Sequence, residues 1–255
     1  MGSLEAFYES GDGDEEMRLA FPEHRLEFLT ASEYMNTYIP PCSRILDNSA
    51  GTGVYSFYLA ERGHVVTAGD IVPHNVDIIN ENALLHSAPL KSTMVLDATD
   101  CGVFGRETFD VVLLMGAYYH LTDGAARDRA LLEANRILVS GGLLFLTYIN
   151  RFSVILANMS GGVDNIDEIN DFLGTGIEDI FYTSTPDATA GDVLLSGFEI
   201  VKHISLDGIS NYLFNVTGKI DKAGLRNFGK YHAKTRENSE LLGYGYHNMI
   251  IARKM

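Results

Sequence analysis

Hydrophobic and polar positions follow two alternating periods along the first 150 residues. Apolar residues recur at helical spacing over residues 22–39, and Pro40-Pro41 ends that helix. Short, continuous apolar runs then predict strands that are buried on both faces, at residues 44–47, 65–70, 93–96, 109–115 and 143–149. Helical patterns lie between them, at residues 54–63, 74–86 and 123–139, and we expect the last helix to stop at Gly141-Gly142.

This alternation predicts an α/β fold with a mostly parallel sheet and helices on both of its faces. The pattern weakens after Asn150, and residues 151–187 are predicted to be an insertion that covers the strand ends. A helix at 188–197, a helical stretch near 219–240 and strands at 198–205 and 247–253 complete a seven-stranded sheet. Residues 22–255 are therefore expected to form one domain, preceded by a mobile acidic segment at residues 1–21.

The amino-acid composition limits the kinds of binding partner that we expect. The 255 residues carry 34 acidic and 19 basic side chains, a net charge of −15, so a nucleic-acid partner is disfavoured. Cys42 and Cys101 have no metal-ligand spacing, and we expect free thiols and no metal site. The sequence shows neither a signal peptide nor an apolar run of membrane-spanning length, so a cytoplasmic protein without membrane contact, monomeric or homodimeric, is expected.

A glycine-bearing turn follows the first predicted strand. Ligands of open α/β sheets bind beyond the carboxyl ends of the strands, where Asp47 to Gly53 is placed, and Gly51 and Gly53 let the backbone approach a ligand closely. Asp70 ends the second strand, where a carboxylate can accept ribose hydroxyls. Asp97-Ala98 after the third strand and Met115-Gly116 after the fourth complete a nucleoside site in the expected order.

Ser56 separates two classes of nucleotide. A dinucleotide-binding turn has its third glycine at this position, where the helix approaches a pyrophosphate. With a serine there, the ligand need not carry a pyrophosphate, and a zwitterionic nucleoside such as S-adenosylmethionine fits at least as well.

At these residues the sequence resembles the class I S-adenosylmethionine-dependent methyltransferases. Residues 45–53 resemble the first motif of the family, Asp70 matches its ribose-binding acid, and residues 135–143 resemble its helix-turn-strand signature. Residues 114–121 are similar to a bacterial subgroup of small-molecule methyltransferases with a Gly-Pro-x-Tyr-His-Leu turn. The sequence departs from the resemblance at Ser49, usually glycine, and at Ala117, usually proline, and we expect altered loop geometry there.

The resemblance implies a Rossmann-like class I methyltransferase fold, S-adenosylmethionine as cofactor, S-adenosylhomocysteine as product and a small-molecule acceptor. The residues expected to bind the cofactor are Asp47, Ser49, Gly51, Gly53, Asp70, Ile71, Asp97, Ala98, Met115 and Gly116. His120 and Tyr119 are the candidate catalytic residues, because they follow the fourth-strand turn beside the expected methyl group. Residues 151–187 are expected to act as a lid over the acceptor.

Several residues could have a structural role instead of a functional one. His120 could anchor its loop, and one of Tyr118 and Tyr119 is expected in the core. Tyr8 could close over the cofactor or belong to a disordered tail. Arg25, Glu27, His232 and His247 also match the subgroup. As single histidines, His232 and His247 are more often structural. Arg25 and Glu27 are expected on a solvated helix face, with contact to the cofactor's charged tail as the alternative.

Three other functions stay open. The chain could methylate protein or RNA, although its acidity and the lack of an added recognition domain count against this. It could hold S-adenosylmethionine or a nucleotide without any transfer. A nicotinamide-dependent oxidoreductase is disfavoured by Ser56.

Overall fold

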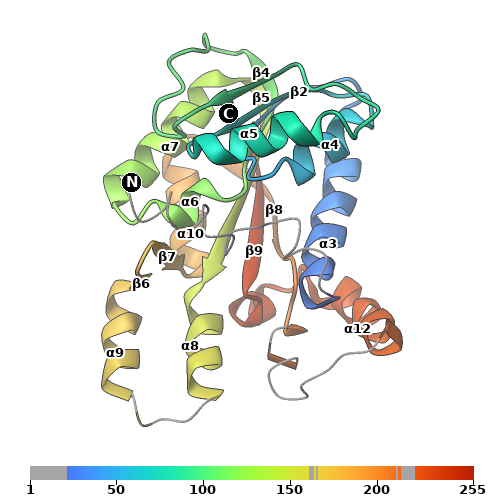
Figure 1. The fold of residues 1–255 in the computed structure, drawn as a ribbon. Coiled ribbons are helices and arrows are strands. Elements are labelled where there is room, and N and C mark those ends of the chain that lie inside the picture. Colours follow the sequence, from blue (N-terminus) through green and yellow to red (C-terminus); the bar gives the residue numbers. More distant parts are fainter. Residues whose placement is uncertain (1–21, 161–163, 165, 211, 214–221) are drawn as a thin grey trace.

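The computed structural model describes residues 22–160, 164, 166–210, 212–213 and 222–255. The expected acidic segment 1–21, with Tyr8, lies outside the described residues. The sheet and its flanking helices are shown in Figure 1.

The central sheet contains the seven strands expected from the sequence. β1 to β5 pair in parallel in the order β3-β2-β1-β4-β5, and β9 joins β5 and β8 by antiparallel pairing. The bounds are β1 Arg44–Asn48, β2 Val65–Asp70, β3 Ser92–Val95, β4 Phe109–Leu114, β5 Leu138–Asn150, β8 Phe198–Ser205 and β9 His247–Lys254.

Helices cover both faces of this sheet, as predicted. Buried residues of α3 (Pro22–Tyr38) and α4 (Val54–Ala60) pack on one face, together with Ile45, Val111 and Phe145. Buried residues of α7 (Gly124–Ile137) and α10 (Pro186–Leu195) pack on the other face, with Val112 and Leu144. Adjacent residues of β4 and β5 therefore point into opposite core layers, which explains why these strands are apolar throughout.

The other helices lie at the edges of these layers. α5 (Pro73–Asn82) packs beside β2 and β3, and α12 (Lys222–Thr235) packs on α3. The 3₁₀ helix η1 (Ser239–Tyr244) precedes β9. The helical stretch expected near 219–240 is thus α12 followed by η1, with residues 219–221 outside the described part.

The end of the α7 prediction was wrong. The helix stops at Ile137 and β5 begins at Leu138, so Gly141 and Gly142 lie within the strand and do not terminate the helix. The register between β4 and β5 shifts at this point, and Gly141 has a φ of 75°. A bulge with a glycine in the left-handed region accounts for the extra residues.

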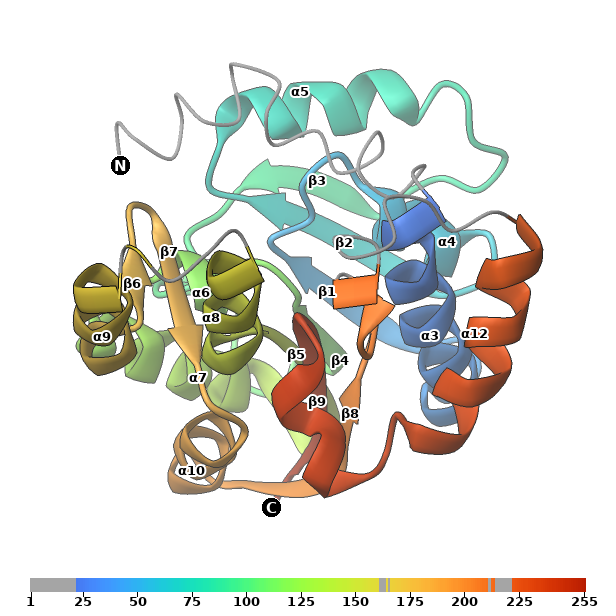
Figure 2. The same cartoon turned by 90° about the horizontal axis from the view of Figure 1, so that it is seen from below.

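The segment predicted to be an insertion has regular structure of its own. It contains α8 (Arg151–Ser160), α9 (Ile166–Thr175) and a hairpin of β6 (Ile177–Glu178) and β7 (Phe181–Ser184). β7 pairs with the last residues of β5. Arg151 donates to the carbonyls of Leu173 and Thr183 and so links α8 to both later elements. Figures 1 and 2 show α8 and α9 beyond the carboxyl end of β5.

Candidate functional site

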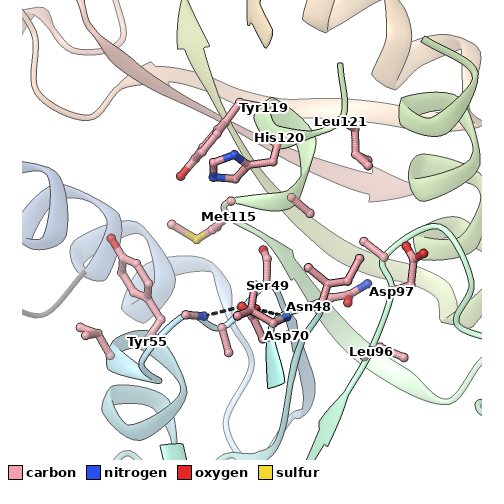
Figure 3. A pocket seen from close by; sticks show the side chains of 18 residues that line it. Asn48, Ser49, Tyr55, Asp70, Leu96, Asp97, Met115, Tyr119, His120 and Leu121 are labelled. Atoms are coloured by element: carbon pink, nitrogen blue, oxygen red, sulfur yellow. Dashed lines mark hydrogen bonds between the residues drawn. The ribbon is translucent and has the colours of Figure 1, made fainter. Parts of the chain in front are cut away.

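A cleft opens at the carboxyl ends of β1 to β4, where the strand order reverses between β1 and β4. Its empty volume, including the mouth, is about 830 Å³. Figure 3 shows the side chains that surround it. The lining residues are Asn48, Ser49, Ala50, Gly51, Val54, Tyr55, Asp70, Ile71, Val72, Leu96, Asp97, Ala98, Met115, Gly116, Ala117, Tyr119, His120 and Leu121.

Eight of the ten residues predicted to bind a cofactor line this cleft. The structure brings together Ser49, Gly51, Asp70, Ile71, Asp97, Ala98, Met115 and Gly116. Both candidate catalytic residues, Tyr119 and His120, line it as well. Asp47 and Gly53 do not line the cleft.

Asp47 and Gly53 instead shape the turn. The buried Ser56 hydroxyl donates to Asp47 Oδ2 at 2.6 Å, which fastens α4 to the end of β1. Gly53 has a φ of 91°, and a Cβ atom there would stand 2.8 Å from the Phe57 ring. Only glycine combines this left-handed conformation with so close a neighbour. Asp47, Gly53 and Ser56 thus hold the backbone that carries Gly51 to the cleft.

Asp70 is the buried acid of the cleft. Its Oδ2 accepts a hydrogen bond from the Gly51 amide at 2.8 Å, and its Oδ1 accepts from the Val72 amide at 2.9 Å and the Asn75 side chain at 3.1 Å. Burial raises the pKa of this carboxyl, and the three hydrogen bonds oppose the rise. Asp70 thereby joins the glycine turn after β1 to the start of α5 (Figure 3).

Asp97 forms the opposite wall with apolar neighbours. Its Oδ1 accepts hydrogen bonds from the Thr99 amide and hydroxyl, each at 2.8 Å, so Oδ2 can take a further donor. Leu96, Ala98 and Leu121 lie around it in the lining. An apolar slot with one carboxylate at its edge suits a flat base that carries an amino group.

Ser49 adopts a backbone conformation that favours glycine, with a φ of 133°. Its Oγ lies 3.2 Å from the position that a Cβ atom of Gly116 would occupy, so the turns after β1 and β4 nearly touch. This explains why the resembling motif usually has glycine at the position of Ser49. The buried Ser49 Oγ and Asn48 Oδ1 have no hydrogen-bond partner among the described residues, as expected of polar atoms that await a ligand.

The residues after β4 divide between core and cleft. Tyr118 of α6 (Ala117–His120) is fully buried, and its hydroxyl donates to Asp192 Oδ2 at 2.6 Å. Tyr119 and His120 face the cleft. The sequence predicted that one of these two tyrosines lies in the core but did not indicate which. The structure places Tyr118 in the core and Tyr119 in the cleft.

His120 lies in a largely apolar setting. Its Nδ1 is 3.4 Å from the carbonyl oxygen of Ile180, and its ring stands 4.8 Å from the ring of Phe181. Desolvation lowers the pKa of His120 to about 4. The imidazole is therefore neutral at pH 7, which suits hydrogen bonding better than proton abstraction, since an efficient base has a pKa near the working pH.

Sequence reasoning missed a second group of ionisable side chains. Glu27, expected on a solvated face, is buried, and its Oε2 lies 3.2 Å from Nδ1 of the buried His247. Asp207 Oδ2 is 3.5 Å from the same nitrogen. The expectation for Glu27 was wrong because this residue of α3 packs against the start of β9. No local pattern links these three residues, although the subgroup resemblance had marked Glu27 and His247.

His232 has a structural environment. It is buried on α12, its Nε2 is 3.2 Å from the Thr30 hydroxyl, and desolvation lowers its pKa to about 4. The prediction missed several lining residues, among them Asn48, Val54 and Tyr55. Asn48 lies within the first motif, and Val54 and Tyr55 begin the helix that directly follows Gly53, so their position beside the glycine turn was the available signal.

Neither a candidate metal site nor a membrane-spanning helix occurs among the described residues. In the described ranges, no group of three or more histidine, cysteine or acidic residues could hold a metal ion. No helix within that part of the chain has the length and apolar character needed to cross a bilayer.

Known proteins resemble this chain in sequence. Residues 46–146 match a family model described as a methyltransferase domain. A ubiquinone biosynthesis O-methyltransferase of Xanthomonas campestris is 31% identical over 160 residues, which cover 61% of each chain. Its counterpart in Xanthomonas oryzae is 32% identical over 124 residues, covering 49% of this chain and 50% of the relative. The match therefore spans less than two thirds of these relatives.

Solved structures share the fold at low sequence identity. A methyltransferase from Methanosarcina mazei, described as dependent on S-adenosylmethionine, superposes with a TM-score of 0.61 at 19% identity, over 87% of this chain and 97% of that one. A possible histamine N-methyltransferase from Thermotoga maritima gives 0.58 at 18% identity, over 95% of both chains. Both of these solved proteins are described as dependent on S-adenosylmethionine. The chain shares the fold of these methyltransferases, and its residues 46–146 match a methyltransferase domain model.

Proposed function

We propose that the protein transfers a methyl group from S-adenosylmethionine to a hydroxyl of a small-molecule acceptor. The observation that carries the proposal is the convergence of Gly51, Asp70, Asp97 and Met115 from four separate strand ends into one cleft. The O-methyltransferases among the relatives support a hydroxyl acceptor.

The cleft fits an adenosine with a charged amino-acid tail. A carboxylate has about four acceptor positions, and the three donors on Asp70 leave room for one ribose hydroxyl. Asp97 Oδ2 and its apolar neighbours suit the adenine amino group and ring. The unpaired Ser49 Oγ can donate to a carboxylate beside the turns after β1 and β4.

S-adenosylmethionine supplies a methyl group already activated on a sulfonium, so the protein chiefly positions the acceptor and excludes water. We assign this positioning to Tyr119 and His120, which line the cleft beyond Met115. The neutral His120 ring is suited to orient a hydroxyl by hydrogen bonding. Residues 151–187 supply the cover on this side, and hydrogen exchange there should slow when both substrates are bound.

Calorimetry with S-adenosylhomocysteine and with NAD tests the cofactor. We expect micromolar-scale affinity for the former and no heat from the latter. Tight NAD binding without any S-adenosylhomocysteine heat would refute the proposal. Transfer of a labelled methyl group to a panel of phenols and alcohols then tests the reaction, and retained cofactor with no transfer to any acceptor class would leave a binding module instead.

A further inference from the structure

One arginine joins the turn after β4 to the β6–β7 hairpin. Arg127 lies near the start of α7, and its Nη1 donates to the carbonyl oxygens of Leu121 and Thr122, at 2.6 and 3.1 Å. Its guanidinium carbon lies 3.5 Å from the centre of the Tyr182 ring of β7. Leu121 lines the cofactor cleft and directly follows His120. A single side chain therefore contacts both the cleft turn and the hairpin.

The two faces of β7 have different neighbours, because successive side chains of a strand point to opposite sides. On one side, the Phe181 ring centroid lies 4.8 Å from that of His120 and 6.5 Å from that of Tyr119. On the other side, the Tyr182 ring packs edge-on against the buried Tyr118, with centroids 6.1 Å apart. Figures 1 and 2 both show β7 beside α6, which carries these partners. A shift of β7 would therefore disturb the aromatic side chains that face the cleft.

Arg127 makes these contacts without an ion pair in a strongly acidic protein. The chain has 34 acidic side chains, yet none pairs with Arg127 within the described ranges. Its buried Nε also has no hydrogen-bond partner among those residues, a cost that an arginine in solvent would not bear. A planar guanidinium can stack on an aromatic ring while its edge donates hydrogen bonds, and an ammonium group cannot do both in this geometry. The arrangement is thus specific to arginine.

The end of the hairpin is fixed to the sheet, whereas its first residues are not. Residues 183 and 184 pair with the last residues of β5, and Arg151 donates to the carbonyl of residue 183 at 2.9 Å. Phe181 and Tyr182 pair, among the described strands, only with the two-residue strand β6. Their position beside the cleft therefore depends on side-chain contacts such as the stacking of Arg127 on Tyr182.

We propose that Arg127 is a positioning residue for the acceptor side of the cleft. It fixes the turn after β4 against β7, so that Tyr119, His120 and Phe181 form one aromatic wall. This inference rests on the proposed methyl transfer, in which the wall orients the acceptor, and Arg127 acts through the wall without touching either substrate. Because Arg127 also holds the carbonyl of the cleft-lining Leu121, order that a bound cofactor imposes on the turn reaches β7 through this side chain.

Hydrogen exchange with and without saturating S-adenosylhomocysteine tests this coupling. In the wild type, the bound product should slow exchange of residues 177–184 by about 5- to 20-fold, because ordering the turn also orders the strand that it contacts. Arg127→Met keeps a long side chain but removes the hydrogen bonds and the charge, and the slowing should fall below about twofold. S-adenosylhomocysteine affinity and the slowing at the glycine turn, residues 48–53, should stay unchanged.

Three further variants make the exchange measurement specific. Arg129→Met is the matched control, since Arg129 is exposed on the same helix, and it should keep the wild-type slowing. Arg127→Lys retains the charge and a donor without the planar group and should give an intermediate value. Tyr182→Leu removes the ring under the guanidinium and should lose the slowing as Arg127→Met does. A merely structural role would speed exchange equally with and without S-adenosylhomocysteine, and an unchanged ratio in Arg127→Met and Tyr182→Leu overturns the inference.

A fluorescence titration gives an independent readout. The chain contains no tryptophan, so Phe181→Trp introduces a single fluorophore into the wall. Its emission should shift as S-adenosylhomocysteine binds, and adding Arg127→Met should abolish the shift while calorimetry records the same affinity. Equal shifts in both backgrounds overturn the inference. Binding to the wild type without any slowing at residues 177–184 overturns this inference alone, whereas absence of S-adenosylhomocysteine binding overturns the proposed function.

Discussion

The cofactor cleft and the Glu27–Asp207–His247 group lie at one edge of one sheet, yet the chain builds them in different ways. In the cleft, Gly51 and Asp97 come shortly after β1 and β3, and Asp70 is the last residue of β2. In the ionisable group, the three residues come from the first described helix, the segment after β8 and the start of the last strand. Each residue of the cleft is placed by its own β-α unit. The ionisable group, in contrast, forms only when distant segments of the chain pack together.

This difference shows what a strand-by-strand pattern can encode. Parallel strands bring their carboxyl ends together, so residues that follow them in sequence share a cleft whatever the rest of the chain does. The buried ionisable group depends on the antiparallel pairing of β9 with both β5 and β8. The matched methyltransferase domain ends at residue 146, within β5 and before β8 and β9.

Loss of the Asp70 carboxylate should have the largest effect among these predictions. It tests the cleft, whose residues are placed by their own β-α units. Asp70→Ala removes the acceptor for Gly51, Val72 and Asn75 and one ribose contact at once. We expect S-adenosylhomocysteine affinity to fall about 100-fold, or about 3 kcal/mol, in calorimetry. Asp77→Ala, on the exposed side of α5, should leave the affinity unchanged. Equal affinities in both variants would contradict the assigned cofactor site.

The sequence predicted the sheet, both helix layers and most of the cleft, since apolar runs and glycine turns report local structure. It missed the regular structure of residues 151–187, where the helices α8 and α9 have only ten residues each and the strands β6 and β7 only two and four. It also misjudged Glu27, because a single charged residue on a helix is normally solvated. Only the packing of α3 against the β8–β9 end of the sheet reveals that this carboxylate is buried.

The glycine turn can be tested through stability. Gly53→Ala combines a φ of 91° with a Cβ only 2.8 Å from Phe57, and we expect a loss of about 2–4 kcal/mol in urea unfolding. Gly63→Ala is a matched control, with a similar φ of 85° but no atom within 4 Å of the added Cβ. It should lose about 1 kcal/mol. Equal losses would show that the contact with Phe57 adds nothing to the rigidity of the turn.

Protonation of His203 tests the part of the sheet where β8 and β9 pair with β5, which forms from distant segments of the chain. Asn248 donates to the Tyr148 hydroxyl at 3.1 Å, and that hydroxyl lies 2.8 Å from His203 Nε2, within hydrogen-bond distance. Burial lowers the pKa of His203 to about 4, against about 6.5 when unfolded. The unfolded chain therefore binds the extra proton between these values, and stability falls as pH drops through this window.

Allowing for partial exposure, the His203 contribution should be about 1–2 kcal/mol between pH 7 and pH 5. Urea unfolding at both pH values measures it as the difference between wild type and His203→Gln. His120 and His232, with similarly lowered pKa values, remain in both proteins and cancel. A variant that loses as much stability as the wild type would show that His203 accepts a proton in the folded state.

The smallest effect is expected at Ser49. Two variants distinguish the backbone strain of this residue from a role of its hydroxyl in cofactor binding. Ser49→Gly relieves a φ of 133° and should raise the free energy of unfolding by about 1 kcal/mol, whereas Ser49→Ala keeps the strained backbone and should not. Both variants remove the hydroxyl that has no partner among the described residues. If that hydroxyl binds the cofactor's carboxylate, S-adenosylhomocysteine affinity falls about three- to tenfold in both variants, independently of the change in stability. If affinity instead rises with stability in Ser49→Gly alone, the serine only strains the turn, and the local half of the site is tuned by backbone conformation instead of by this side chain.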